Sequence, residues 1–271
     1  MKNLAYLFFI CLIYASTAFA ETQAEALPIE ASLKLLHFNY EEFDQSGDTF
    51  NEEEGLIPGL ALTASKTLGD FTNSISFEGY GGTVDYDGMT QSGIPLETET
   101  NETIYRLFYR LDWSPKEYDN TISIYGKVAW QQWDREILPS TISSRLFEQY
   151  EWWTLEIGFT IPIYKNKNNF WSFELGVLKT TNGTIEIDLS RQGFGKPELK
   201  LGSGSGVNTS LLYQYAINER SELGFSLQYQ HWEFGRSNTR SISNGIIVID
   251  FTEPESETAH TSLSINYQYH F

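Results

Sequence analysis

Along most of the chain, apolar side chains alternate with polar ones, so that hydrophobicity repeats every second residue. The C-terminus shows this clearly, because Leu263, Ile265, Tyr267, Tyr269 and Phe271 alternate with small or polar residues. A period of two places such apolar side chains on one face of a β-strand. The pattern recurs often enough to predict about ten strands, near 32–40, 57–67, 72–86, 103–113, 121–133, 150–163, 170–187, 206–217, 222–234 and 258–271.

These strands predict an all-β fold, a transmembrane antiparallel up-and-down barrel of about ten strands, with eight or twelve as alternatives. Its connections alternate in length. Four are short turns rich in Asn, Asp, Lys and Pro, at 68–71, 114–120, 164–169 and 218–221, and five are longer loops, at 41–56, 87–102, 134–149, 188–205 and 235–257. Short turns of such barrels face the periplasm, so both termini are expected there.

The last long loop contains a hairpin signal of its own, Asn244-Gly245, followed by the apolar run 246–251. Two more membrane strands here would give the count of twelve. Arg240, Asp250 and Glu253 flank the turn and make burial in lipid unfavourable, so we expect the hairpin to extend the wall beyond the membrane.

The N-terminus predicts a secretory signal peptide. Lys2 precedes an apolar run at 4–14, which is too short to span a bilayer and is followed by Ala18-Phe19-Ala20, a typical cleavage site. We therefore expect residues 1–20 to be removed, 21–30 to form a short periplasmic segment and 31–271 to form the barrel. The single cysteine, Cys11, lies in the leader, which excludes disulfides and cysteine chemistry from the mature chain.

Composition agrees with a barrel. The hydrophobic fraction is only 41% although aromatic residues reach 15%, as expected where only alternate residues face lipid and aromatics gather at the interfaces. Removal of the leader leaves 17 basic and 36 acidic residues and a net charge of −19. Such an acidic surface makes nucleic acid an unfavourable partner.

Alternation also predicts which residues face the lumen. In the segment 103–113, Leu107 and Leu111 share one face while Arg106 and Arg110 share the other, and charges cannot face hydrocarbon cheaply. The same alternation in the other segments places four cations and three carboxylates inside the barrel, and we expect them to form a polar lumen network. Its members are Lys34, Glu78, Arg106, Arg110, Lys127, Glu156 and Glu174.

A barrel of this size has an interior that side chains can nearly fill. A packed network of neutralising ion pairs is therefore the expected state of the lumen. The alternative is a narrow path or gate, with Arg106 and Arg110 opposite Glu156 or Glu174 at its constriction.

Acidic residues gather in the first long loop and in the region around the start of the second. Carboxylates so close repel one another unless a cation lies among them, and Ca²⁺ or Mg²⁺ bridging to lipopolysaccharide would supply it. Simple solvation is favoured, because the spacing matches no calcium-binding motif. No other cofactor is expected. The candidate ligands are Asp44, Asp48, Glu52, Asp85 and Asp87.

The sequence suggests two catalytic hypotheses, a protease and a lipid hydrolase. The acidic pair in Gly82-Thr83-Val84-Asp85-Tyr86-Asp87-Gly88 resembles the paired aspartates of the omptin proteases, which also have ten strands; paired carboxylates can position a water for attack on a peptide. That resemblance implies a second dyad of Asp and His on the fourth outer loop, where the chain offers Asp188 and no histidine.

Lipid hydrolases of this kind instead pair His with Ser on the lipid-facing surface. His231 and His260 are expected on neighbouring final strands, with His231 beside Tyr229, but no serine stands in an evident partner position. A histidine in an aromatic belt is more often an interface residue.

The architecture over 31–271 and the C-terminal Tyr267-Gln268-Tyr269-His270-Phe271 resemble the general class of Gram-negative outer-membrane β-barrel proteins. The resemblance implies that the terminal strand is the signal read by the barrel assembly machinery, that outer-membrane lipid and lipopolysaccharide are partners, and that the protein is a monomer of the cell outer membrane. It implies no substrate, because fold does not settle function.

We therefore predict a noncatalytic barrel with a plugged polar lumen and acidic extracellular loops, acting as a structural, surface-binding or narrow-channel protein. A small-solute porin is one alternative. An outer-membrane hydrolase, either omptin-like or lipid-modifying, is the other.

Overall fold

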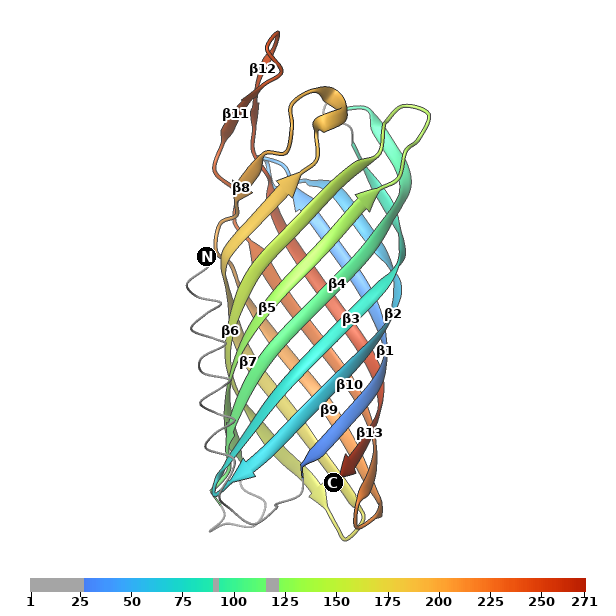
Figure 1. Ribbon diagram of the computed structural model, residues 1–271, viewed down its shortest axis with the longest axis vertical. Helices are drawn as coiled ribbons and strands as arrows, with labels where there is room; N and C mark the ends of the chain where they lie inside the picture. Colours follow the sequence, from blue (N-terminus) through green and yellow to red (C-terminus); the bar gives the residue numbers. More distant parts are fainter. Residues whose placement is uncertain (1–26, 90–92, 116–121) are drawn as a thin grey trace.

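The computed structural model describes residues 27–89, 93–115 and 122–271, and it shows a closed antiparallel barrel of ten strands (Figure 1). The all-β fold class and the strand number are therefore confirmed. The wall strands are β1 (Pro28–Phe43), β2 (Thr49–Leu68), β3 (Phe71–Met89), β4 (Pro95–Trp113), β5 (Ser123–Ile137), β6 (Leu146–Lys165), β7 (Asn169–Ile187), β9 (Ser205–Asn218), β10 (Ser221–Phe234) and β13 (Glu255–His270).

Each wall strand pairs with its neighbours in sequence, and β13 pairs with β1 along its whole length to close the barrel. The register runs from Pro28 opposite His270 to Phe43 opposite Glu255. Closure leaves no free sheet edge in the wall, which is what allows strands to cross a bilayer with every backbone group hydrogen-bonded.

Three short strands and one helical turn lie outside this wall. Strand β8 (Glu198–Lys200) pairs with the upper end of β7, after the one-turn 3₁₀ helix η1 (Ser190–Gln192). Strands β11 (Arg240–Ser243) and β12 (Val248–Phe251) form a separate two-stranded sheet that projects from the top of the barrel (Figure 1). The hairpin therefore adds no membrane strands, and a count of twelve is wrong.

The two ends of the barrel differ. Short connections join β2 to β3, β6 to β7 and β9 to β10, and Gly69 makes the first of these turns with a positive φ of 62°. The predicted turn at 114–120 lies largely outside the described residues. We call this the turn end and the opposite one the extended end. Leu27 and Phe271 meet at the turn end, where the Phe271 amide donates to the Leu27 carbonyl.

The strands reach further toward the extended end than the sequence suggested. The expected loops at 41–56 and 87–102 are wrong, because both regions are mostly strand, and β1 and β2 are joined only by a tight turn after Phe43. Beyond the lipid an outward position needs no apolar side chain. The outward residues there are mostly acidic, so the hydrophobic alternation that marks a strand fades although the strand continues.

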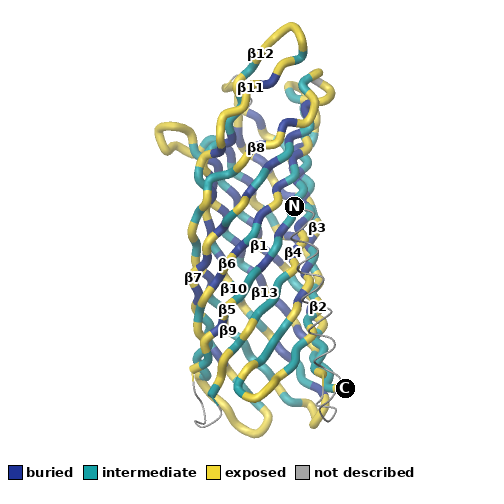
Figure 2. Tube along the Cα trace, turned by 60° about the vertical axis from the view of Figure 1, so that its left-hand side comes forward, coloured by how far each residue is buried: buried dark blue, intermediate teal, exposed yellow. Residues whose placement is uncertain are grey.

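An apolar belt surrounds the lower part of the barrel, with exposed and buried positions alternating along each strand (Figure 2). Leu33, Leu60 and Ile157 are each about 60% exposed, which only a lipid environment accommodates at so many positions. The belt consists of outward side chains that include Leu33, Leu35, Leu60, Leu62, Ile75, Phe77, Tyr105, Leu107, Leu111, Leu155, Ile157, Leu175, Val177, Leu211, Phe225, Leu227, Leu263 and Ile265.

Within the described residues, no helix is both long and apolar enough to cross a membrane. The first strand begins at Pro28, three residues before the barrel start expected from the sequence. The predicted signal peptide lies outside the described residues.

The terminal strand has the expected outward face. Leu263, Ile265 and Tyr267 belong to the lipid-facing surface, and the rings of Tyr269 and Phe271 meet edge to face at 4.8 Å. Its role as an assembly signal stays a prediction.

Candidate functional site

The lumen at the level of the apolar belt contains the seven charged residues that parity assigned to it. Lys34 bonds to Glu78, and Arg106 lies with Nη1 3.8 Å from the same carboxylate. Arg106 also places Nη2 2.5 Å from Nδ1 of His260, a partner on β13 that sequence reasoning did not assign to the network.

The other half of this network lies against β4 to β7. Arg110 donates from Nη1 to Glu174 at 2.7 Å and from Nε and Nη2 to Asp112. Lys127 lies 2.5 Å from Glu156, whose other oxygen accepts from Tyr125. Every cation of the network therefore has a carboxylate partner, as buried charges require.

A cavity of about 120 Å³ lies within the network. A cavity of this size has room for several water molecules. Arg106 Nε and Gln131 Oε1, both buried, have no hydrogen-bond partner within the described structure and belong to residues that line the cavity. The lining residues are Glu78, Arg106, Phe108, Arg110, Lys127, Ala129, Gln131, Thr154, Glu174, Gln228 and Gln230.

Above the network the lumen contains a large apolar cluster, which the sequence analysis did not foresee. Trp133 stacks on Tyr150 at 4.6 Å between ring centres and meets Phe38 edge to face at 5.5 Å. Trp152 meets Phe234 edge to face at 5.4 Å. We call this the aromatic core; its other members include Leu36, Tyr40, Ile57, Tyr80, Val84, Ile104, Leu178, Ile185, Ile187, Leu199 and Trp232.

These side chains come from strands all around the wall and are almost fully buried. The predicted plug is therefore only half polar: ion pairs fill the lumen beside the belt, and the aromatic core fills it toward the extended end. The interiors of folded proteins are close-packed, and these buried side chains form an interior of that kind.

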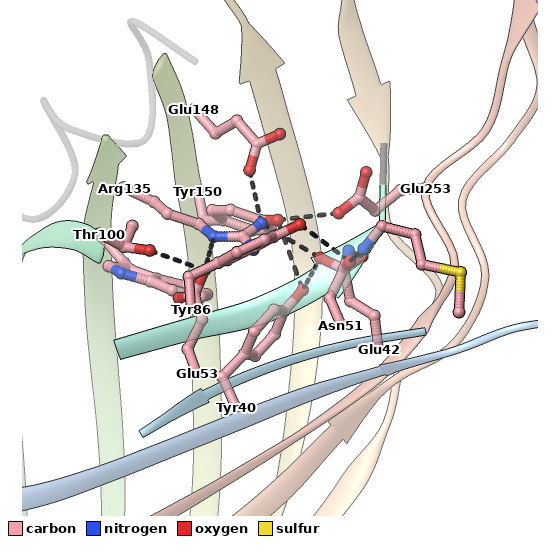
Figure 3. Close-up of polar contacts among 12 residues, drawn as sticks. Tyr40, Glu42, Asn51, Glu53, Tyr86, Thr100, Arg135, Glu148, Tyr150 and Glu253 are labelled. Carbon is pink, nitrogen blue, oxygen red and sulfur yellow. Dashed lines mark hydrogen bonds and ion pairs between the residues drawn. The ribbon is translucent and has the colours of Figure 1, made fainter. Parts of the chain in front are cut away.

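Near the extended end, a single arginine lies among carboxyl groups (Figure 3). Arg135 on β5 donates from Nε to Glu53 at 2.7 Å, and from Nη1 to Glu148 at 2.7 Å and to Glu42 at 3.1 Å. Its side chain is 2% exposed. Two further carboxyls, Glu102 and Glu253, lie in the same place; we call Arg135 and these five glutamates the arginine cluster.

The arginine cluster lies beyond the apolar belt and has more acid than base. Glu102 accepts from the indole of Trp133, and Glu253 accepts from the hydroxyl of Tyr150 at 2.8 Å. Burial, and then the charge of Glu53, raises the pKa of Glu102. Burial is also the main cause that raises the pKa of Glu253, followed by the charges of Glu42 and Glu148. Burial without a matching cation favours the neutral form of both carboxyls.

Sequence reasoning missed the arginine cluster, although a signal for it exists. If the strands are continued past the belt, the alternation of inward and outward positions places five of its residues on the inner face of the wall. These are Glu42, Glu53, Glu102, Arg135 and Glu148. The loops assigned at 41–56, 87–102 and 134–149 hid that alternation.

The acidic residues proposed as metal ligands are spread along the extended end. Asp44 caps the turn after β1, where its Oδ1 accepts from the amides of Ser46 and Asp48. Asp85 and Asp87 point outward from β3 and are exposed. Within the parts of the chain that the structure describes, no three acidic, histidine or cysteine side chains converge as metal ligands would. Bridging to lipopolysaccharide stays a prediction.

Cross-strand pairing brings six outward carboxylates into one row around the wall. Like charges directly opposite one another on paired strands destabilise a sheet. The row runs from β10 through β13, β1, β2 and β3 to β4 as Glu233, Glu257, Glu41, Glu52, Asp87 and Glu97.

The residues suggested for catalysis do not meet. Asp188 follows β7, which three intervening strands separate from β3, and it pairs with Lys196 at 3.1 Å. Hydrogen bonds from Ser190 are the main cause that lowers the pKa of Asp188 to about 2. His231 lies 3.3 Å from Glu257, an acidic neighbour that sequence reasoning missed, but the residues opposite it are Ala259 and Val207.

No protein-family model matches the chain, and no curated protein matches it. Solved structures match it by fold. The outer membrane protease OmpT from Escherichia coli is 8% identical, with a TM-score of 0.58 over 93% of this chain and 99% of that one.

Two further structures are less similar. The translocator domain of the autotransporter NalP from Neisseria meningitidis is 11% identical, with a TM-score of 0.48 over 100% of this chain and 97% of that one. OprG from Pseudomonas aeruginosa is 12% identical, with a TM-score of 0.45 over 92% and 97%. At these identities the likeness shows the fold alone, and the expected barrel fold is confirmed.

Proposed function

Because the chain is an outer-membrane β-barrel of ten strands, we propose that it is a closed, noncatalytic barrel that binds other surfaces through its extended end. The aromatic core is the observation that supports this proposal. A solute moving along the lumen would have to pass Trp133, Tyr150 and Trp152, which are each at most 3% exposed. Opening such a path would break a packed core rather than move a loop.

Orientation follows from the class. Short turns of outer-membrane barrels face the periplasm and longer extensions face the outside. The extended end is then extracellular and both termini are periplasmic. Lipopolysaccharide would surround the acidic row, and the assembly machinery would read β13.

The hairpin of β11 and β12 is the proposed contact element. Its tip carries three consecutive aliphatic side chains, Ile246, Ile247 and Val248, of which Ile246 is 91% exposed. An exposed apolar group surrounded by polar surface often marks a site of interaction. The tip lies beyond the belt, so lipid of the same membrane does not cover it.

The arrangement gives no support to catalysis. Asp85 and Asp87 point away from the lumen, and the buried carboxyls of the arginine cluster lie within a packed interior rather than in a cleft. A hydrolase needs a nucleophile or an activated water within reach of substrate.

We predict that the refolded mature protein adds no conductance steps to a planar bilayer. The aromatic core should keep the lumen closed, so replacing Arg106 with alanine should leave the bilayer equally silent. Heat-modifiable migration in electrophoresis checks that both proteins are folded.

A narrow ion path is the second candidate, because the cavity among Arg106, Arg110 and Lys127 offers polar space at the level of the belt. Conductance in the native protein that changes with Arg106→Ala would support this path, or a small-solute porin, and would refute the closed barrel.

We predict that cells displaying the protein adhere to hydrocarbon droplets more than cells displaying a variant with serine at 246, 247 and 248. The apolar tip supplies the contact, so its loss should return adhesion to that of cells without the protein. Ile142→Ser is the matched control, because Ile142 is also exposed at the extended end but lies on another loop. Equal adhesion of the tip variant and the native protein would contradict the assignment.

A further inference from the structure

Glu253 connects the projecting hairpin to the interior of the barrel. It lies between β12 and β13, and only 5% of it is exposed. Its backbone amide donates to the Ser237 hydroxyl at 2.7 Å, and its carbonyl accepts from the Ser237 amide at 3.1 Å. Both ends of the segment 237–253 are therefore joined at the point where the Glu253 side chain enters the barrel mouth.

The Glu253 carboxyl faces acidic groups from several strands (Figure 3). Strand β6 contributes Tyr150, which donates to it, and Glu148; β1 contributes Glu42 and the hydroxyl of Tyr40, which lies 3.5 Å from that of Tyr150. Strand β5 contributes the single cation, Arg135. The rest of the arginine cluster is Glu53 on β2 and Glu102 on β4, with Tyr86 of β3 beside it.

Charge balance distinguishes Glu253 and Glu102 from the other three carboxyls of the arginine cluster. Arg135 donates directly to Glu42, Glu53 and Glu148, whereas Glu253 accepts from the neutral phenol of Tyr150 and Glu102 from the neutral indole of Trp133. Five ionised carboxylates around one guanidinium would leave four uncompensated charges in a buried site. The position of Glu253 is therefore compatible with a neutral carboxyl and opposed to a charged one.

We propose that the carboxyl of Glu253 is a proton-operated latch that holds the extracellular hairpin on the barrel mouth when protonated and loosens it when ionised. The inference deepens the proposed function, since it names a regulation of the proposed contact element. The latch is tested by the mobility of the hairpin, and this mobility can be measured whether or not the tip binds another surface.

The direction of the effect follows from the charges. Burial and the nearby carboxylates raise the pKa of Glu253 when it is docked. Docking is then fully favoured below the usual glutamate pKa and is lost as the pH rises through the raised value. The hairpin should be held in acid and looser in neutral or alkaline medium.

Loosening is partial, because other contacts do not titrate with Glu253. The Asn238 side chain accepts from the amide of Lys200, and Arg240 donates to the carbonyl of Glu198. These bonds join the lower part of the hairpin to β8, so the tip gains motion while its base stays near the mouth.

The test is a nitroxide on the hairpin of the mature, full-length barrel refolded in lipid. The only cysteine of the sequence, Cys11, lies in the predicted leader, so Ile247→Cys gives the mature barrel a single labelling site. Mobility is read by electron paramagnetic resonance from about pH 4 to about pH 9, a range that spans the usual glutamate value and a raised one. We expect the native side chain at 253 to give a sigmoidal rise in mobility with pH.

Two variants define the result. Glu253→Gln keeps the shape and the Tyr150 contact without an ionisable proton, so its hairpin should stay in the low-mobility state at every pH. Glu255→Gln is the matched control, because Glu255 is exposed two residues further along, and it should keep the native pH profile.

Tyr150→Phe is an independent check that needs no change at Glu253. The Tyr150 hydroxyl favours the ionised carboxyl by donating to it. Without it the midpoint of the mobility change should move to higher pH.

A native pH profile in Glu253→Gln would overturn the latch, and so would flat mobility in the native protein. A change caused by Mg²⁺ at constant pH, and abolished by Glu253→Gln, would also overturn it by showing control by a cation. Loss of adhesion by the tip variant, or its persistence, bears only on the proposed function.

Discussion

Replacing Arg135 with methionine is expected to lower the free energy of unfolding by about 3–5 kcal/mol, the cost of removing one partner from buried ion pairs. Arg135 is the only cation that contacts Glu42, Glu53 and Glu148 in the described structure. Methionine fills similar space, so the loss reports charge rather than volume. Urea unfolding of the refolded barrel, followed by tryptophan fluorescence, measures the change.

Arg145→Met is the matched control. Arg145 pairs with Glu136 at 3.0 Å at the same end of the barrel, but its side chain is 45% exposed. Exposed pairs contribute at most about 1 kcal/mol. Equal effects of the two substitutions would show that the arginine cluster is solvated and not buried.

Replacing Trp152 with alanine is expected to cost about 3–5 kcal/mol, as large-to-small changes do in packed cores. Trp152 is 2% exposed and contacts the rings of Trp232 and Phe234. The same unfolding measurement checks it.

Trp113→Ala is the control for this change, because Trp113 lies on the outer surface at the turn end and is 42% exposed. Lipid or detergent can replace its contacts, so its loss should cost clearly less. A Trp152 variant as stable as the Trp113 variant would mean that the lumen is loosely filled, which would weaken the case for a closed barrel.

The wall of the barrel could be predicted from sequence because lipid imposes a simple rule. Positions such as Leu107 and Leu155 must be apolar while Arg106 and Glu156 face inward, so alternation alone identified ten strands and the lumen residues between them. The same rule ends where the lipid ends. Outward Glu52 and Asp87 carry no hydrophobic signal, so strands β1 to β4 were cut short.

The arginine cluster and the aromatic core could not be found in the same way. Parity shows that Arg135 or Trp133 points inward, but not which strands bring them partners, since Arg135 meets Glu53 across two intervening strands. Such contacts depend on the register and closure of the whole barrel. Sequence reasoning also took the lumen as polar throughout, whereas the part outside the lipid is built like the interior of a soluble protein.

The filled lumen has a consequence for the cell envelope. A barrel that conducts is costly to express at high density, because each copy lowers the permeability barrier of the outer membrane. If the barrel is closed by Trp133, Tyr150 and Trp152 as proposed, it adds outer surface without adding a leak. Each added copy would then extend the outer surface and leave the permeability of the membrane unchanged.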